Sequence, residues 1–205
     1  MMTLRITAGT RRLHRCAMAM FASWACAGFA VAAEAGGDAL AALRGGGHVA
    51  IMRHAIAPGN FDPPNFRLGD CSTQRNLSEE GRAQARALGA RLRSAGIARA
   101  RVYAGQWCRT RDTAEQLGLG AVTELPLLNS FVSERGAEAQ RTDALRKWIA
   151  AADLREPVVL VTHQVNITGL TGIFPASGEM IVLGRRADGG FEVAGRVLTG
   201  QDAAR

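Results

Sequence analysis

The sequence has few histidines, and they form no metal-binding motif. Only four occur among 205 residues, and no pair is spaced as His-x-x-x-His or set in a local cluster with aspartates. Catalytic zinc takes three protein ligands, often including a closely spaced pair. We therefore expect no metal and no cofactor. A metallohydrolase that uses His54, His163 and nearby carboxylates is an alternative interpretation.

Lysine is almost absent, because Lys147 is the only lysine among the 25 basic residues. The net charge of +7 and the isoelectric point of about 10.5 are typical of nucleic-acid-binding proteins. Removing residues 1–33, however, takes away four arginines and no acid, which lowers the charge to +3. We therefore expect no nucleic-acid partner. Arginine suits bidentate recognition of phosphate or carboxylate, although genomic base composition is the simpler explanation for most of these arginines.

Residues 1–33 have the three parts of a secretory signal peptide. Four arginines precede an uncharged apolar run at 16–33, and small residues offer cleavage sites at 32–35. The alternative is a retained membrane anchor, since a run of this length approaches what a bilayer requires. We expect cleavage and export to the periplasm or the medium, by the general or the twin-arginine route, and no membrane contact by the mature chain.

Two of the four cysteines lie in the predicted signal peptide, which leaves Cys71 and Cys108 in the mature chain. In an oxidising compartment, two cysteines favour one disulfide. The bond would close a loop of 37 residues. By limiting the entropy of the unfolded chain, it would stabilise the folded protein by roughly 4 kcal/mol at most. Two unpaired buried thiols are the alternative.

No repeat, low-complexity tract or linker divides residues 36–205, so we expect a single domain. Segments with strand and helix patterns alternate along it. Strands are expected at 48–53, 100–105, 157–162, 179–185 and 190–198, and helices from a Ser78 cap to Gly96 and at 110–117, 137–152 and 164–172. This alternation predicts an α/β sandwich with a largely parallel sheet. The uniformly apolar strand 157–162 is expected at its centre.

Three of the predicted strands run into polar residues. Arg53 and His54 end the first, Arg109 follows the second, and His163 follows strand 157–162. In open α/β sheets, ligands bind at the carboxyl ends of the strands. Each residue alone has a structural explanation, but three converging strand ends favour a functional site.

The motifs around these residues, in order, are "MRHA", "RNLSEEGRAQARALG", "WCRTRDTA" and "LVTHQVNITGLTG". Together they resemble the histidine phosphatase superfamily, in its small, phosphoglycerate-mutase-like branch, over residues 48–183. The resemblance implies a three-layer α/β/α sandwich and phosphoryl transfer through a phosphohistidine without a metal.

The resemblance also implies a role for each residue. His54 is the expected nucleophile, attacking through one ring nitrogen while an acceptor holds the other. Arg53 and Arg109 are expected to grip phosphate oxygens, and His163 to donate to the phosphoryl group. Gln164 beside it is a further candidate for substrate contact. The expected substrate is a phosphorylated small molecule or a phosphohistidine protein, and the sequence does not indicate an oligomeric state.

The sequence departs from the family pattern at two places. Ala55 stands where the family usually has glycine after the histidine. The segment 125–131, "LPLLNSF", lacks the proton-donating glutamate that many members carry there. Glu134 lies just beyond and is the candidate general acid, with Glu179 as a second candidate, although either one is equally interpreted as a surface carboxylate. A weakly active or inactive phosphate-binding relative is therefore a further alternative.

Overall fold

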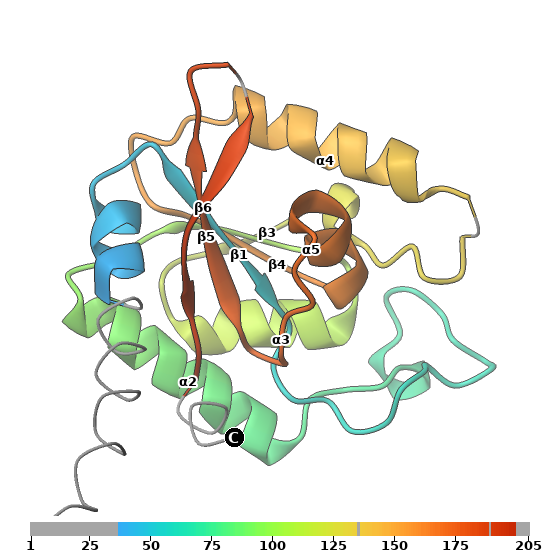
Figure 1. The fold of residues 1–205 in the computed structure, drawn as a ribbon. Helices are drawn as coiled ribbons and strands as arrows, with labels where there is room; N and C mark the ends of the chain where they lie inside the picture. Colours follow the sequence, from blue (N-terminus) through green and yellow to red (C-terminus); the bar gives the residue numbers. More distant parts are fainter. Residues whose placement is uncertain (1–36, 135, 189, 200–205) are drawn as a thin grey trace, which may run out of the picture.

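The computed structural model describes residues 37–134, 136–188 and 190–199, so the predicted signal peptide and its cleavage site lie outside the described residues. A central six-stranded sheet has the order β3-β2-β4-β1-β5-β6 (Figure 1). The strands are β1 (His48–Arg53), β2 (Arg101–Ala104), β3 (Val122–Glu124), β4 (Val158–Thr162), β5 (Met180–Arg185) and β6 (Phe191–Val197).

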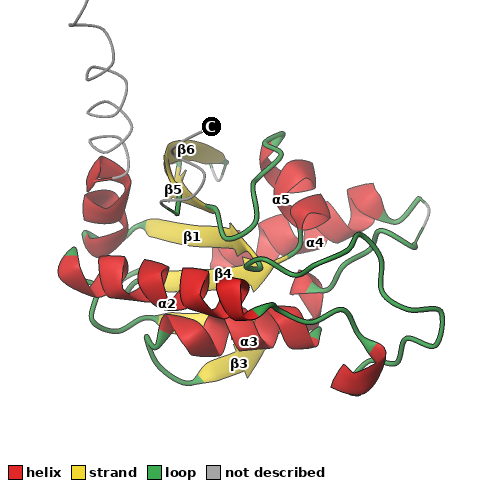
Figure 2. Cartoon of the chain, turned by 90° about the horizontal axis from the view of Figure 1, so that it is seen from below, coloured by secondary structure: helices red, strands yellow, loops and turns green. Residues whose placement is uncertain are grey.

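Helices cover both faces of the sheet (Figures 1 and 2). Residues 37–44, α2 and α3 contribute to one buried apolar core, and α4 and α5 contribute to a second core on the other face. The helices are α2 (Glu79–Ser94), α3 (Cys108–Leu117), α4 (Glu138–Ala151) and α5 (Gln164–Thr171). The sheet therefore lies between two hydrophobic cores, and the expected three-layer α/β/α sandwich is confirmed.

The strand directions bring several carboxyl ends to one edge of the sheet. β1 pairs with β4, β4 with β2, and β2 with β3, all in parallel. Only β5 and β6 run antiparallel to their neighbours. All five residues of β4 are buried, as expected of a strand covered on both faces. The ends of β1 and β4 and the residues after β2 therefore meet at the same edge.

The predicted elements are present with small shifts at their ends. Ser78 caps α2 by accepting a hydrogen bond from the Gly81 N–H (3.0 Å), as its position before two glutamates indicated. β3, the helical residues 37–44 and two short 3₁₀ helices, η1 (Cys71–Thr73) and η2 (Pro126–Leu128), were not anticipated. β3 has only three residues and little burial, too little for a periodic signal. In the described part of the chain, no helix combines the length and apolarity needed to span a membrane.

Candidate active site at the carboxyl ends of β1 and β4

His54 stands at the carboxyl end of β1, directly after Arg53. Its backbone N–H donates to the Thr162 carbonyl at the end of β4 (2.9 Å). The ring Nδ1 lies 2.8 Å from the Ala55 carbonyl oxygen. Because a carbonyl oxygen only accepts, Nδ1 carries the proton and Nε2 keeps the lone pair that a nucleophile needs. Burial, and next the charge of Arg109, lowers the pKa of His54 to about 3, so the ring is neutral near pH 7.

The backbone after His54 is held against two helices. The Ala55 N–H donates to Thr113 Oγ1 of α3 (3.0 Å), and the Ile56 N–H donates to Gln84 Oε1 of α2 (3.1 Å). A Cβ on Gly81 would lie only 2.1 Å from the Ile56 carbonyl oxygen, so a glycine is needed where α2 approaches this turn. The carbonyl that orients the His54 ring is therefore fixed by packing on both sides.

His163 follows β4 and is the N-cap residue of α5. Its ring centroid lies 5.5 Å from that of His54 and 5.2 Å from that of Trp107, both in edge-on arrangements. Burial, followed by the proximity of His54, lowers the pKa of His163 well below its usual value. The two imidazoles are thus neighbouring neutral rings at the ends of adjacent parallel strands.

The two arginines come from different layers of the fold. The Arg53 backbone N–H donates to the Glu179 carbonyl (3.1 Å), and its Nη1 donates to the Pro175 carbonyl (3.1 Å). Arg109 lies in the first turn of α3 and is 4% exposed. Its Nη1 and Nη2 donate to the two carboxylate oxygens of Asp62, at 2.8 and 3.2 Å. Both guanidiniums are therefore anchored, and each keeps other N–H groups for a ligand.

Four buried nitrogens of this cluster lack a hydrogen-bond partner within the described residues. They are Nε of Arg53, Arg75 and Arg109, and Nε2 of His163. A buried polar group left without a partner costs about 1–3 kcal/mol, so such groups are uncommon unless a ligand or water engages them. These nitrogens belong to the residues around His54: the His163 ring centroid lies 5.5 Å from that of His54, and the charges of Arg109, Arg75 and Arg53 all lower its pKa. The arrangement suits a bound oxyanion.

The cluster gathers positive charge rather than metal ligands. Burial, followed by the charge of Arg109, lowers the pKa of both Arg53 and Arg75, yet a guanidinium stays protonated in proteins. Within the described ranges, no group of three or more His, Cys, Asp or Glu is placed to hold a metal ion. Three arginines around two neutral imidazoles favour a phosphate-sized anion.

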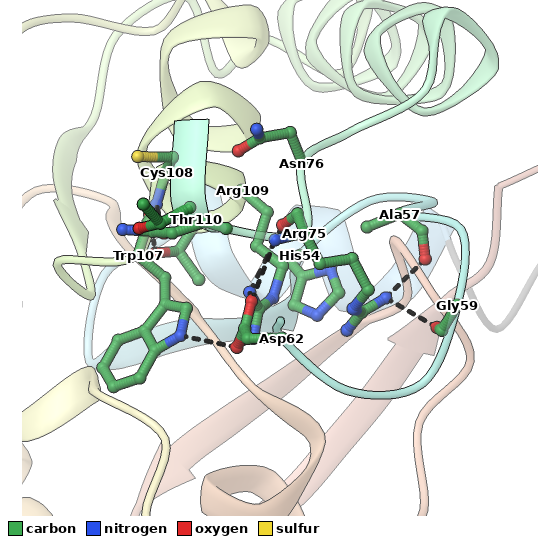
Figure 3. Close-up of polar contacts among 12 residues, drawn as sticks. His54, Ala57, Gly59, Asp62, Arg75, Asn76, Trp107, Cys108, Arg109 and Thr110 are labelled. Atoms are coloured by element: carbon green, nitrogen blue, oxygen red, sulfur yellow. Dashed lines mark hydrogen bonds and ion pairs between the residues drawn. The ribbon is translucent and has the colours of Figure 1, made fainter. Parts of the chain in front are cut away.

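Asp62 and Arg75 were not identified from the sequence. The Asp62 carboxylate accepts hydrogen bonds from Arg109, from Trp107 Nε1 (3.0 Å) and from the Arg75 N–H (3.0 Å) (Figure 3). Arg75 Nη1 donates to the carbonyls of Ala57 and Gly59, which brings the loop after β1 back on itself. Both residues lie in this irregular loop, where periodicity gives no signal. The signal that could have indicated them is their position in the loop that follows the strand carrying His54, because functional residues are often found in such loops.

The two predicted acids are engaged elsewhere. Glu134 is exposed, and both of its carboxylate oxygens accept from Arg141 of α4, with contacts as short as 2.8 Å. Glu179 is buried, and its carboxylate accepts from Arg196 of β6 and from the Ala176 N–H. In the described part of the chain, neither carboxylate contacts the histidines or arginines of the site.

The amides beside the site are also paired. Gln164 Nε2 donates to Thr168 Oγ1 (2.7 Å), one turn along α5. Asn129, in the segment that lacks the family glutamate, exchanges hydrogen bonds with Gln106: its Oδ1 accepts from the Gln106 N–H (2.7 Å) and its Nδ2 donates to Gln106 Oε1 (2.9 Å). The Gln164 side chain is therefore held by a partner within α5.

The structure brings Cys71 and Cys108 together, with their Cα atoms 5.7 Å apart and their sulfurs at bonding distance. This separation lies within the range of disulfides. The Cys108 N–H, at the start of α3, also donates to Gln74 Oε1 (2.9 Å). The loop after β1 is therefore attached to α3 one residue before Arg109.

The sheet order, the two helical layers and the His–Arg cluster define a phosphoglycerate-mutase-like α/β protein. Residues 49–131 match the family described as the histidine phosphatase superfamily (branch 1). The matched segment contains His54, Asp62 and Arg109, and the chain is similar to this superfamily over that segment. No curated protein matches the sequence significantly.

Several solved structures share the fold. The protein histidine phosphatase SixA complexed with tungstate has 17% identity and a TM-score of 0.53, over 75% of this chain and 98% of that one. A mycobacterial glucosyl-3-phosphoglycerate phosphatase complexed with VO3 has 15% identity and a TM-score of 0.54, over 71% and 96%. Phosphoserine phosphatase from Entamoeba histolytica, complexed with 3-phosphoglyceric acid, has 13% identity and a TM-score of 0.56, over 75% and 98%. At these identities the likeness establishes a common fold.

Proposed function

We propose that this chain is an exported, metal-independent phosphatase that hydrolyses a phosphomonoester or a phosphoramidate through a covalent phosphohistidine on His54. The match of residues 49–131 to the histidine phosphatase superfamily supports a phosphatase. The structural neighbours include phosphatases whose names refer to phosphohistidine proteins and to phosphorylated small molecules, and both classes are candidate substrates. The composition of residues 1–33 supports export.

One observation carries the proposal. His54 has its Nδ1 proton held by the Ala55 carbonyl, so Nε2 is a neutral nucleophile, and the cluster around it holds buried nitrogens of Arg53, Arg109 and His163 that have no partner within the described residues. Phosphoryl transfer needs mainly positioning of the nucleophile and neutralisation of the charge on the equatorial oxygens. Buried donors without a partner destabilise the fold, and a bound phosphate would supply acceptors for those of this cluster.

We assign one task to each group. Nε2 of His54 attacks phosphorus, while the guanidiniums of Arg53 and Arg109 hold the equatorial oxygens. His163 donates from its unpartnered Nε2 to an oxygen on which charge develops. The bond to the leaving group breaks, and a phosphohistidine forms on His54. Water then attacks phosphorus, the P–N bond breaks, and phosphate leaves.

The proposal is tested by trapping the intermediate. Protein mixed with a radioactive phosphomonoester and quenched rapidly should carry label that is lost in acid and kept in base, as for a phosphoramidate. His54→Ala should abolish both the label and hydrolysis. His48→Ala is the matched control, because His48 lies at the other end of β1, where its Nδ1 bonds the Gly46 carbonyl. Hydrolysis at the wild-type rate by His54→Ala would refute the proposal.

Two measurements separate the alternatives. Hydrolysis should continue in EDTA, whereas a metallohydrolase would lose activity and regain it with a divalent ion. A phosphate-binding relative without turnover would bind inorganic phosphate through Arg53 and Arg109 and show no labelled His54.

A further inference from the structure

The proposed phosphatase needs a proton donor for its leaving group, and the structure offers a carboxylate that the sequence did not reveal. Hydrolysis of an alkyl phosphomonoester expels an alkoxide, which is a poor leaving group unless it is protonated as the P–O bond breaks. Among the described residues, Asp62 is the only carboxylate that bonds a side chain of the His54, His163, Arg53 and Arg109 cluster.

We propose that Asp62 is the general acid of this site, and that its presence extends the substrates to phosphomonoesters of ordinary alcohols. The inference rests on the proposed phosphatase function and adds the class of leaving group that the site accepts. A phosphorylated imidazole would not need such an acid, because its leaving group is already good.

The position of Asp62 fits this role. Its two oxygens occupy the Nη1 and Nη2 end of the Arg109 guanidinium, which leaves Nε of Arg109 free for a phosphoryl oxygen. One guanidinium therefore spans both the acid and the phosphoryl group. Trp107 and the Arg75 N–H hold the same carboxylate from two other directions, so its orientation is fixed by three partners. Figure 3 shows the bonds of Asp62 with Arg109 and Trp107.

Substrate binding supplies the condition under which Asp62 becomes an acid. Burial opposes ionisation of Asp62, but its hydrogen bonds with Arg109 and Arg75 outweigh burial and hold its pKa below the usual value. A phosphate dianion on Arg109 neutralises that cation and repels the neighbouring carboxylate, which raises the carboxyl pKa. Asp62 is then protonated while the substrate is bound, and it is ionised after it has given its proton to the leaving alcohol.

The steps balance. His54 Nε2 forms the N–P bond, the P–O bond to the alcohol breaks, and its electron pair takes the proton of Asp62. The alcohol leaves, and Asp62 is a carboxylate beside the phosphohistidine. It then accepts a proton from the attacking water as the O–P bond forms and the P–N bond breaks. Phosphate and the protonated Asp62 result, and the cycle closes without any other reactant.

The structure also allows two simpler roles for Asp62, and each has its own kinetic signature. If it only orients Arg109, its loss weakens hydrolysis of every substrate equally. If it only occupies the anion site before substrate arrives, its loss speeds hydrolysis of every substrate. A general acid alone acts in proportion to how poor the leaving group is.

The test compares Asp62→Asn with the wild type on p-nitrophenyl phosphate, a good leaving group, and on glycerol phosphate, a poor one. Asparagine keeps the size and one acceptor oxygen for Arg109. We expect kcat/KM for glycerol phosphate to fall by about 10²–10⁴-fold more than that for p-nitrophenyl phosphate. Asp62→Glu, which restores a carboxylic acid, should recover part of this difference, and Asp143→Asn on the exposed face of α4 should show none.

Equal losses on both substrates, gains on both, or a wild type that hydrolyses p-nitrophenyl phosphate but not glycerol phosphate would each overturn the proposal. Glu134→Gln tests the rival acid: a selective loss there and not in Asp62→Asn would also overturn it. If Asp62→Asn does not fold, Asp62→Glu decides alone, because absence of activity on glycerol phosphate in a folded Asp62→Glu protein contradicts the inference. Failure of the proposed function is distinguishable, since it would appear in the wild type as a missing phosphohistidine label.

Discussion

The buried imidazole of His54 predicts a loss of stability in mild acid. Its pKa falls from the usual 6.5 to about 3 in the folded protein, because burial and Arg109 disfavour the charged ring. Below pH 6.5 the unfolded chain therefore binds a proton that the folded chain does not. The stabilisation is present in full above pH 6.5 and is lost as the pH falls towards 3. Between about pH 7.5 and pH 5, this one group lowers the free energy of unfolding by about 2 kcal/mol.

The assay is urea unfolding of the oxidised protein at the two pH values, followed by the fluorescence of Trp107 and Trp148. His54→Asn removes the titrating ring and keeps a donor for the Ala55 carbonyl, so its loss between the two pH values should be smaller by about 2 kcal/mol. Burial, the largest cause of the lowered pKa of His163, is kept in the variant, but the smaller contribution of His54 is lost, so both proteins are compared in a His163→Asn background. The same loss in the variant as in the wild type would refute a buried, neutral His54.

Three further predictions concern the site and the processing of the chain. His163→Ala should slow turnover by about 10²–10³-fold, the scale for one preorganised oxyanion donor, while the phosphohistidine still forms on His54; an unchanged kcat would show that His163 does not contact the phosphoryl group. Cys71 and Cys108 should resist alkylation without reductant, as mass spectrometry will show, and two modified thiols would contradict the disulfide. N-terminal sequencing of exported protein should find a first residue between 33 and 36, whereas recovery of residues 1–10 would exclude cleavage there.

The main features of the fold and the central residues of the site were predictable because their signals are local. A continuous apolar run such as 158–162 predicts a strand that is buried on both faces, and the polar residue directly after it marks the carboxyl end of that strand. The alternation of elements then predicts parallel strands, whose ends meet at one edge of the sheet. These two steps were enough to expect that His54 and His163 are neighbours, and their ring centroids lie 5.5 Å apart.

The identity of the candidate acid was not predictable, because it depends on how an irregular loop folds back. Glu134 was favoured by its place in the chain, beside the segment that holds a glutamate in many relatives, yet its carboxylate pairs with Arg141. Asp62 lies eight residues after His54 in a stretch rich in proline and glycine, and nothing in its spacing indicates where it points. Only tertiary contacts with Arg109 and Trp107 place it in the site.

The long loop after β1 makes several of its contacts with the start of α3. The Asp62 carboxylate accepts hydrogen bonds from Trp107 and Arg109, and Gln74 accepts one from the Cys108 N–H. The sulfurs of Cys71 and Cys108 lie at bonding distance. Irregular loops of this length are uncommon in compact domains unless they have a function, because ordering each residue costs about 1–2 kcal/mol of conformational entropy. These contacts fall on Trp107, Cys108 and Arg109, and the last of the three is the arginine expected to hold the phosphate. The contacts that order this part of the loop therefore also position that arginine.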